Sequence, residues 1–375
     1  MYLSNEEEHA LNGEYGEALA TAYRILVAIG EATNAEKLIQ VDWAHVSGVN
    51  YNTIGDAGLA FLEEMSKEKV KIRTTINPMG FDPKKPNVND EFINKQNRII
   101  NAYKSMNADL TLTCIPYEVL ELPKSKYVSL AESNAAVYTN SLLDYRTNKE
   151  SALSALASAF TGKAPYSLLR KEEYREPDTN IIVKTELKNE LDYGLLGYFA
   201  GKVAKNSVSI PNTIDKIWNA KAICAGLGTS GSCGMFTNKE GGEKVEYGKE
   251  EREEVLQELS NTDDGDLIIF GSPQLGFQDL NRLAAKIKNK KFKKRCIAFC
   301  ARKAYEDAYK YGITGRLEKA GVELYSDCCA CLTPLVNEGD EIITNSIKGA
   351  YYLKTWNKAK ICLKSMDDII KSDAE

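Results

Sequence analysis

The sequence predicts an α/β protein with mostly parallel strands, and two observations lead to this fold class. Strand-like and helix-like segments alternate along nearly the whole chain, as they do where helices connect parallel strands. The chain has 375 residues, which is long for a single hydrophobic core, so we expect two or more lobes. A gradual change in pattern near 205–220 suggests an N-terminal region, 1–205, and a C-terminal region, 206–375.

The N-terminal region is expected to begin with a helix over roughly 5–30. Ser4 precedes three glutamates in a capping pattern, and apolar residues then recur at helical spacing. The segments that follow alternate: strands are expected within 37–48, 69–80 and 109–117, and helices within 53–68, 90–106 and 147–170.

The C-terminal region repeats this alternation. Its strand candidates are the short apolar runs 221–226, 266–272, 295–301, 321–327, 341–346 and 359–365, and helices such as 251–260 and 304–313 lie between them. In an open α/β sheet, ligands bind beyond the carboxyl ends of the strands. Several of these strand candidates end in polar or cysteine-containing loops, so we expect the functional site at those ends.

Composition narrows the classes of partner. Hydrophobic residues make up 43% and charged residues 27%, with a net charge of −5 and both signs interspersed. This balance does not favour binding to nucleic acid or to an anionic membrane. We find no apolar run near the ~20 residues of a membrane helix, and the polar, acidic start does not resemble a secretory signal. A cytoplasmic protein is therefore expected.

Nine cysteines are the most unusual feature of the composition. In a cytoplasmic chain we expect them to be reduced, and their odd number and irregular spacing argue against a disulfide framework. Only two histidines are present, His9 and His45, and Cys328 with Cys331 forms the one CxxC-like pair. Zinc is therefore a weak interpretation. No GxSxG motif accompanies either histidine to indicate a serine hydrolase.

Three strand candidates end at cysteines. Cys114 closes 109–117, Cys300 lies at the end of 295–301, and Cys328 and Cys329 follow 321–327. If these ends converge, three thiolates could hold an iron–sulfur cluster and leave one iron open. The alternative is that each thiol is a small buried hydrophobe, which is the better interpretation for any single cysteine.

Two further patterns have competing interpretations. Gly226, Gly228 and Gly231 follow a strand candidate with the GxGxxG spacing of dinucleotide-binding loops, but the residues after them do not read as the required helix. The stretch 131–150 combines small polar residues with Arg146, which suits recognition of an anionic substrate, or else a capped helix that packs closely on its neighbours.

Several long motifs resemble those of the aconitase X family, in the same order. They are "NGEYGEALATAYRILVAIGE", "HVSGVNYNTIGDAG", "TTINPMGFD", "TLTCIPY", "ESNAAVYTNSLLDYRTNKE" and "TNSIKGAYY". The resemblance extends from Met1 to about Ser365. It implies an aconitase-like fold, with several α/β lobes around a central cleft and an iron–sulfur cluster between them, a 4Fe–4S cluster in preference to 2Fe–2S. The open iron of such a cluster acts as a Lewis acid on a departing hydroxyl.

The resemblance also implies a partner. The chain stops where single-chain members would continue into a swivelling domain, so it resembles the large subunit of a two-subunit form. A small subunit would then carry the swivelling domain and the serine that removes the substrate's proton.

Roles for individual residues follow from the same resemblance. Cys114 and Cys329 are expected to be cluster ligands, with Cys300 as the third. His45 is expected to assist hydroxyl departure as an acid, with Ser47 beside it in the same loop. The expected substrate-binding residues are Gly48, Asn77, Glu132, Ser133, Asn134, Asn140, Ser141, Arg146, Thr344, Asn345, Ser346 and Lys348. The sequence departs from the family where Ser272 and Gln274 replace a usual cysteine and histidine, and where Asp144 and Tyr145 replace small residues.

The activity implied is that of a hydro-lyase acting on a small anionic substrate. The leading expectation is dehydration of (R)-5-phosphomevalonate to trans-anhydromevalonate 5-phosphate, in the archaeal modified mevalonate pathway to isoprenoids. Dehydration of cis-3-hydroxy-L-proline or of another hydroxy acid is the alternative within the family. Two alternatives come from other classes: a nucleotide-dependent oxidoreductase that uses Gly226, Gly228 and Gly231, and a non-catalytic scaffold subunit whose cysteines only fill its core.

Overall fold

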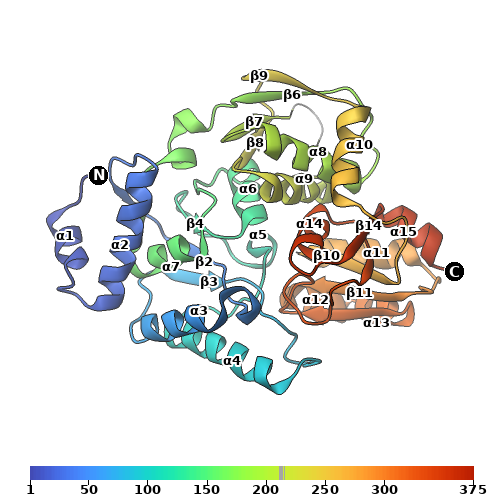
Figure 1. Ribbon diagram of the computed structural model, residues 1–375, viewed down its shortest axis with the longest axis horizontal. Helices are drawn as coiled ribbons and strands as arrows, with labels where there is room; N and C mark the ends of the chain where they lie inside the picture. The colour runs from blue at the N-terminus through green and yellow to red at the C-terminus, as the bar shows by residue number, and fades with distance from the viewer. Residues whose placement is uncertain (211–213, 215) are drawn as a thin grey trace.

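The computed structural model describes residues 1–210, 214 and 216–375, and in these the chain forms three parallel sheets and one antiparallel strand pair. Each parallel sheet belongs to a different part of the chain, and helices cover the sheets (Figure 1). The expected α/β class is therefore confirmed.

The N-terminus forms two helices where the sequence predicted one. α1 (Asn5–Leu11) begins with a capping box in which Ser4 and Glu7 exchange side-chain-to-backbone hydrogen bonds, and α2 (Glu17–Ala32) follows. Gly13 and Gly16 lie between them with φ values of 90° and 106°. Such values suit glycine and end a helix, which explains the break.

The first parallel sheet has the order β3-β2-β4, with β2 (Trp43–Val46) between β3 (Arg73–Ile76) and β4 (Ser129–Leu130). A separate antiparallel pair joins β1 (Leu38–Gln40) to β5 (Lys163–Pro165). The helices of this region are α3 (Tyr51–Met65), α4 (Asp90–Ser105), α5 (Pro116–Val119), α6 (Ser133–Leu142) and α7 (Ala152–Thr161). Two short 3-10 helices, η1 (Leu168–Arg170) and η2 (Glu172–Tyr174), follow.

The second parallel sheet has the order β8-β7-β6-β9. Its strands are β6 (Thr179–Val183), β7 (Ser207–Ser209), β8 (Met235–Thr237) and β9 (Glu243–Tyr247), and its helices are α8 (Glu190–Val203), α9 (Ile217–Ser230) and α10 (Lys249–Leu259). The boundary expected near residue 205 falls between α8 and β7, strands on both sides of it being in this sheet. The division into 1–205 and 206–375 stays a prediction.

The third sheet has five parallel strands in the order β12-β11-β10-β13-β14. The strands are β10 (Leu267–Leu275), β11 (Arg295–Cys300), β12 (Val322–Ser326), β13 (Glu341–Thr344) and β14 (Lys360–Leu363). The helices are α11 (Phe277–Ile287), α12 (Arg302–Lys310), α13 (Ile313–Lys319), α14 (Ile347–Thr355) and α15 (Met366–Asp373). The strand order reverses between β10 and β13, and the crevice beyond the carboxyl ends of two such strands is where open α/β sheets bind ligands.

The strand expected at 221–226 is wrong, because these residues lie within α9. Gly226 and Gly231 of the GxGxxG spacing face α8, and a Cβ on Gly226 would lie 2.3 Å from the carbonyl oxygen of Gly194. These glycines allow two helices to pack closely; they do not form the loop between strand and helix that a dinucleotide site requires.

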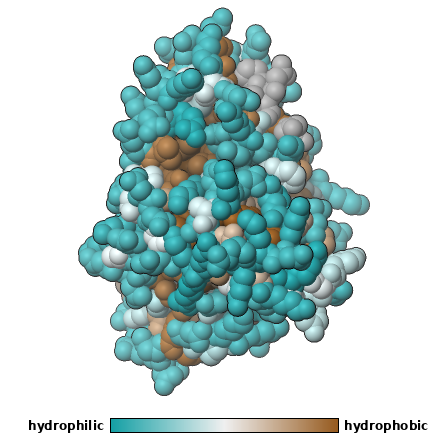
Figure 2. Space-filling model, turned by 90° about the vertical axis from the view of Figure 1, so that its right-hand side faces the viewer, coloured by the Kyte–Doolittle hydropathy of each residue, from teal (hydrophilic) through white to brown (hydrophobic). Residues whose placement is uncertain are grey.

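Among the residues that the structure describes, no helix combines the length and apolar character needed to cross a bilayer. Figure 2 views the molecule from the side of the third sheet, and hydrophilic residues cover most of this face, with hydrophobic residues in smaller patches between them.

Candidate functional site

A cavity of about 380 Å³ lies between two parts of the chain: the first region, which contains the first parallel sheet, and the third region, which contains the third parallel sheet. Loops after β2 and β3, the start of α6, the end of β10, the segment after β12, and α14 all contribute to its wall. Of the residues expected from the sequence, it brings together Ser47, Gly48, Asn77, Cys114, Glu132, Ser133, Cys329 and Lys348.

Parallel strands place these side chains together. β2 and β3 are neighbours in register, so the residues just beyond them, Ser47 and Asn77, emerge at one edge of the first sheet. Gly48 turns the chain there with a φ of 74°. From the third sheet, β10 delivers Ser272, and Lys348 occupies the first turn of α14, just after β13.

A buried chain of hydrogen bonds runs from the first sheet to the cavity. The Trp43 indole N–H donates to Thr75 Oγ1 at 2.8 Å, and Thr75 Oγ1 lies 2.7 Å from His45 Nδ1. His45 Nε2 is 2.8 Å from Asn77 Oδ1, and Asn77 Nδ2 donates to Glu132 Oε2 at 2.7 Å. Because the Asn77 amide nitrogen donates to Glu132, its oxygen must accept, and the proton of His45 therefore lies on Nε2.

His45 is fully buried and is not among the residues that line the cavity. Burial lowers the pKa of His45 to about 4, against the opposing effects of Asn77 and Glu132. The imidazole is therefore neutral near pH 7 and orients Asn77 from behind.

Lys348 and Glu132 form a buried ion pair on the cavity wall. The ammonium of Lys348 also donates to Asn134 Oδ1 at 2.7 Å and to Ser133 Oγ at 3.3 Å. Burial opposes the charge of Lys348, but the Glu132 carboxylate, together with Tyr352 and Cys114, holds the Lys348 pKa above its ordinary value. Lys348 is thus a cation on the cavity wall. Asn134 is itself held by a bond from its amide to the Cys114 carbonyl.

Three thiols line the cavity: Cys114, Cys329 and Cys331. The Cys331 thiol and, to a smaller extent, the Ser272 hydroxyl hold the pKa of Cys329 below its ordinary value, against the effect of burial. Burial and the Glu132 carboxylate raise the pKa of Cys114 well above its ordinary value.

Gln274 links the two cysteine-bearing segments. Its backbone N–H donates to Cys114 Sγ at 3.1 Å, and its side-chain oxygen accepts from the Cys114 N–H at 3.2 Å. The side-chain nitrogen donates to the carbonyls of Leu112 and Cys328, at 3.2 and 3.1 Å. Gln274 is 1% exposed, so these bonds fix both segments from inside the protein.

Several expected residues lie away from this cavity. The Cys300 thiol donates to the carbonyl of Tyr325 at 3.5 Å, and Cys300 belongs to the core packed around the third sheet. Asn345 and Ser346 line a smaller, neighbouring cavity of about 80 Å³, which shares Ser272 with the first. Thr344 is buried beside them, and its hydroxyl accepts from the Ser346 N–H.

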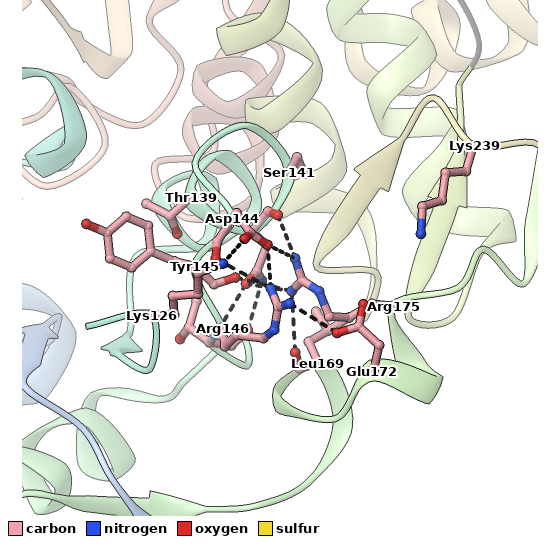
Figure 3. A network of polar contacts seen from close by, with 12 residues as sticks. Lys126, Thr139, Ser141, Asp144, Tyr145, Arg146, Leu169, Glu172, Arg175 and Lys239 are labelled. Carbon is pink, nitrogen blue, oxygen red and sulfur yellow. Dashed lines mark hydrogen bonds and ion pairs between the residues drawn. The ribbon is translucent and has the colours of Figure 1, made fainter. Parts of the chain in front are cut away.

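The residues near the end of α6 that were expected to bind substrate lie away from the cavity and stabilise the fold there (Figure 3). Arg146 donates to Asp144 at 2.7 Å and to Glu172 at 3.0 Å, and Arg175 donates to the Asn140 carbonyl at 2.9 Å. The Ser141 hydroxyl accepts from the Phe236 N–H. For Asn140, Ser141 and Arg146, the closely packed helix is therefore the interpretation that fits.

Sequence reasoning missed Cys331, Ser272 and Gln274 as parts of the site. The signal for the last two was present, because both stand where the resembling family has other residues. Cys331 could be recognised only from its position on the cavity wall, because its surroundings in the sequence are as apolar as those of Cys328 and Cys329.

The side chains around the cavity that could act as metal ligands suit a group that is bound through sulfur. Among the described residues, no three His, Cys, Asp or Glu side chains lie close enough together to hold a single metal ion. An iron–sulfur cluster distributes its cysteine ligands over several iron atoms, so its thiolates do not need to converge on one point.

Family models match this chain in three consecutive segments. The aconitase X first domain matches residues 1–172, the second domain 177–262 and the third domain 265–375. Each segment contains one of the three parallel sheets described above.

One group of relatives has the same span as this chain, and another is longer. The phosphomevalonate dehydratase large subunit of Methanocaldococcus jannaschii is 34% identical, over 99% of this chain and 100% of that protein. The cis-3-hydroxy-L-proline dehydratase of Hypocrea jecorina is 31% identical, over 93% of this chain and 65% of its own length. A crystal structure of Thermococcus kodakaraensis aconitase X in its holo-form superimposes with a TM-score of 0.91 and 31% identity, covering 100% of both chains.

Proposed function

The chain belongs to the aconitase X family, and on that premise we propose that it is the large subunit of an iron–sulfur hydro-lyase. The proposed reaction dehydrates (R)-5-phosphomevalonate to trans-anhydromevalonate 5-phosphate. One observation carries the proposal: thiols and the Lys348–Glu132 ion pair share a single cavity between regions of the chain. Curated relatives named phosphomevalonate dehydratase large subunit, such as those of Methanocaldococcus jannaschii and Thermococcus kodakarensis, support the substrate.

The residues present fit an iron–sulfur cluster. Cys114 and Cys329 line one cavity, and Gln274 ties their segments together from behind. We propose both as ligands, and a 4Fe–4S cluster in preference to 2Fe–2S. When bound, the cluster supplies a Lewis-acidic iron for the hydroxyl that leaves.

The chain's own residues bind and orient the substrate. Lys348 offers its ammonium to an anionic group of the substrate, and Glu132, Ser133 and Asn134 fix the position of that ammonium. Asn77 and Ser47, beside it on the wall, supply hydrogen-bonding groups. Because protein encloses the cavity on several sides, less water surrounds these groups, and electrostatic interactions between them and a substrate are stronger.

The elimination of water needs no reactant besides the substrate. A base takes a proton from the carbon next to the carboxylate, and the electron pair of the broken C–H bond forms the double bond. The hydroxyl leaves from the neighbouring carbon and, with one proton, becomes water. His45 is neutral and lies behind Asn77, so we propose that it positions Asn77, in place of the acid role expected from the sequence.

We propose that the base is a serine of a small subunit carrying the swivelling domain. Lys348 is the one cation among the described residues lining the cavity, and it is already paired with Glu132. A phosphorylated carboxylic acid brings more negative charge than this, which supports a partner that adds cationic groups. The nine free thiols suit the reducing cytoplasm, where we propose that the complex acts.

The test is a substrate comparison on the complex, purified without oxygen together with its small subunit. We expect formation of the anhydro product from (R)-5-phosphomevalonate and no turnover of cis-3-hydroxy-L-proline. The same complex carrying Lys348→Met should lose most of this activity. Turnover of hydroxyproline in place of phosphomevalonate would assign the chain to the other activity of its family.

A further inference from the structure

The cavity wall carries one cysteine, Cys331, that was not expected to be a cluster ligand. Cys329 and Cys331 are two positions apart, and both line the cavity, whereas Cys328 between β12 and Cys329 is fully buried in the core of the third region. The chain turns directly after Cys329, since its carbonyl accepts from the N–H groups of Leu332 and Thr333. This turn brings Cys331 back to the wall that holds Cys329.

Cys300 occupies a different environment. It lies at the end of β11, and its thiol donates to the Tyr325 carbonyl on the neighbouring strand, β12. Its side chain is therefore directed along the sheet, into the core, and it is absent from the cavity wall.

A fixed framework holds the three cavity thiols relative to one another. Gln274 binds the Cys114 segment and the Cys328 carbonyl through one buried side chain. On the far side, the Met79 N–H donates to the Asp327 carbonyl at 2.9 Å, which joins the loop after β3 to the start of the cysteine segment. Because the start of this segment is held from two sides, Cys329 and Cys331 are presented to Cys114 by a preformed scaffold.

We propose that Cys331 is the third ligand of the cluster, together with Cys114 and Cys329, and that Cys300 is a core thiol. This inference rests on the proposed function, since it identifies a ligand of the same cluster. Three thiolates leave one iron of a four-iron cluster without a protein ligand, as a substrate hydroxyl requires. Ser272 lies on the same wall, but a neutral hydroxyl is a much poorer iron ligand than a thiolate.

The test compares iron and acid-labile sulfide per complex after anaerobic reconstitution with the small subunit. The variants are Cys331→Ala and Cys300→Ala, with Cys328→Ala as a matched control in the same loop. We expect Cys331→Ala to lose most of its iron and sulfide, as Cys114→Ala and Cys329→Ala would, while Cys300→Ala and Cys328→Ala retain at least three quarters. Thermal unfolding of the iron-free proteins checks that each variant is folded.

A second measurement separates a ligand from a supporting residue. In Cys331→Ser, an oxygen can replace the sulfur on the iron, so we expect a cluster whose visible sulfur-to-iron absorption and electron paramagnetic resonance signal differ from wild type. A supporting role would leave both spectra unchanged. The inference is overturned if Cys331→Ala keeps the wild-type iron content, or if Cys300→Ala loses it. If the wild-type complex itself takes up no iron or sulfide, the proposed function fails first.

Discussion

We expect substitution of Lys348 to have the largest effect of any single substitution on the free energy of unfolding. Its ammonium and the Glu132 carboxylate are buried together, and removing one partner leaves the other charge without compensation. Lys348→Met should therefore lower the free energy of unfolding by about 3–5 kcal/mol, measured by denaturant titration.

The matched control is the double variant Glu132→Gln with Lys348→Met, which contains no buried charge at this position. It should regain most of the stability, because two neutral side chains can replace a buried ion pair at little cost. Activity should stay lost in the double variant, since no cation remains to meet the substrate. Recovery of activity would exclude Lys348 from substrate binding.

His45 predicts a pH dependence of stability. Its pKa is about 4 in the folded protein and about 6.5 in an unfolded chain. Between these values the unfolded chain binds a proton that the folded chain does not. His45 therefore lowers stability as the pH falls through this window, by about 1.4 kcal/mol per pH unit.

The measurement is denaturant unfolding of wild type and His45→Gln between pH 7 and pH 4. The difference between the two proteins should change with this slope, since other groups titrate alike in both. A constant difference would mean that folded His45 takes up its proton over the same pH range as the unfolded chain, and the hydrogen-bond chain to Glu132 would then need a different set of donors in that range.

At this scale the sequence predicted residue types better than residue positions. Cys114 and Cys329 lie on the cavity, as do Asn77, Glu132 and Lys348. Cys300 does not, because the terminal residue of a strand can face either side of the sheet, and one residue of register decides which. Such a register is set by tertiary packing and leaves no trace in a short apolar run.

The crossing of α8 and α9 tests how the elements pack. A Cβ on Gly226 would lie 2.3 Å from the Gly194 carbonyl oxygen, so Gly226→Ala must push the two helices apart. We expect a loss of about 1–3 kcal/mol in the free energy of unfolding. Gly315→Ala in α13 is the matched control: its Cβ would meet no atom within 4 Å, and it should stabilise by about 0.5–1 kcal/mol.

The same variant tests the nucleotide interpretation of these glycines. NAD should not bind to wild type in calorimetry, and Gly226→Ala should change stability alone. Saturable NAD binding that disappears in the variant would contradict the packing role.

Elements were predictable where pattern and length agreed. The apolar runs from 266 onward became β10 to β14, because each is short and apolar and all but β12 are followed by a helix. The run 221–226 has the same local composition and became part of α9. Periodicity over six residues cannot separate a buried strand from a buried helix, so only contact with α8 settles the structure there.

At the scale of the whole molecule, the cavity exists because two sheets from distant parts of the chain meet at their carboxyl ends. The first sheet supplies Asn77 and, just after β4, Glu132; the third sheet supplies Cys329 and Lys348. Sequence patterns located most of these strand ends, but not which ends would meet. That choice depends on packing between sheets, which no local pattern encodes.

Asp82 joins the first and third regions through buried hydrogen bonds. It is 3% exposed, and its carboxylate accepts from the Ser326 N–H at 2.9 Å, the Ser326 hydroxyl at 3.1 Å and Arg302 at 3.2 Å. Ser326 ends β12, just before the cysteine segment. Asp82→Ala should therefore cost about 3 kcal/mol in the free energy of unfolding. It should also loosen the cysteine segment at the cavity.

Hydrogen exchange measured by mass spectrometry can locate this effect. We expect faster exchange in residues 74–85 and 322–333, which contain the Met79 and Ser326 amides, and wild-type exchange in the second sheet. Glu323→Gln is the control, because it breaks only a partly exposed pair with Arg295, worth less than about 1 kcal/mol. If Asp82→Ala lowers stability but leaves exchange in 322–333 unchanged, Asp82 stabilises its own loop, and the two regions are held together by other contacts.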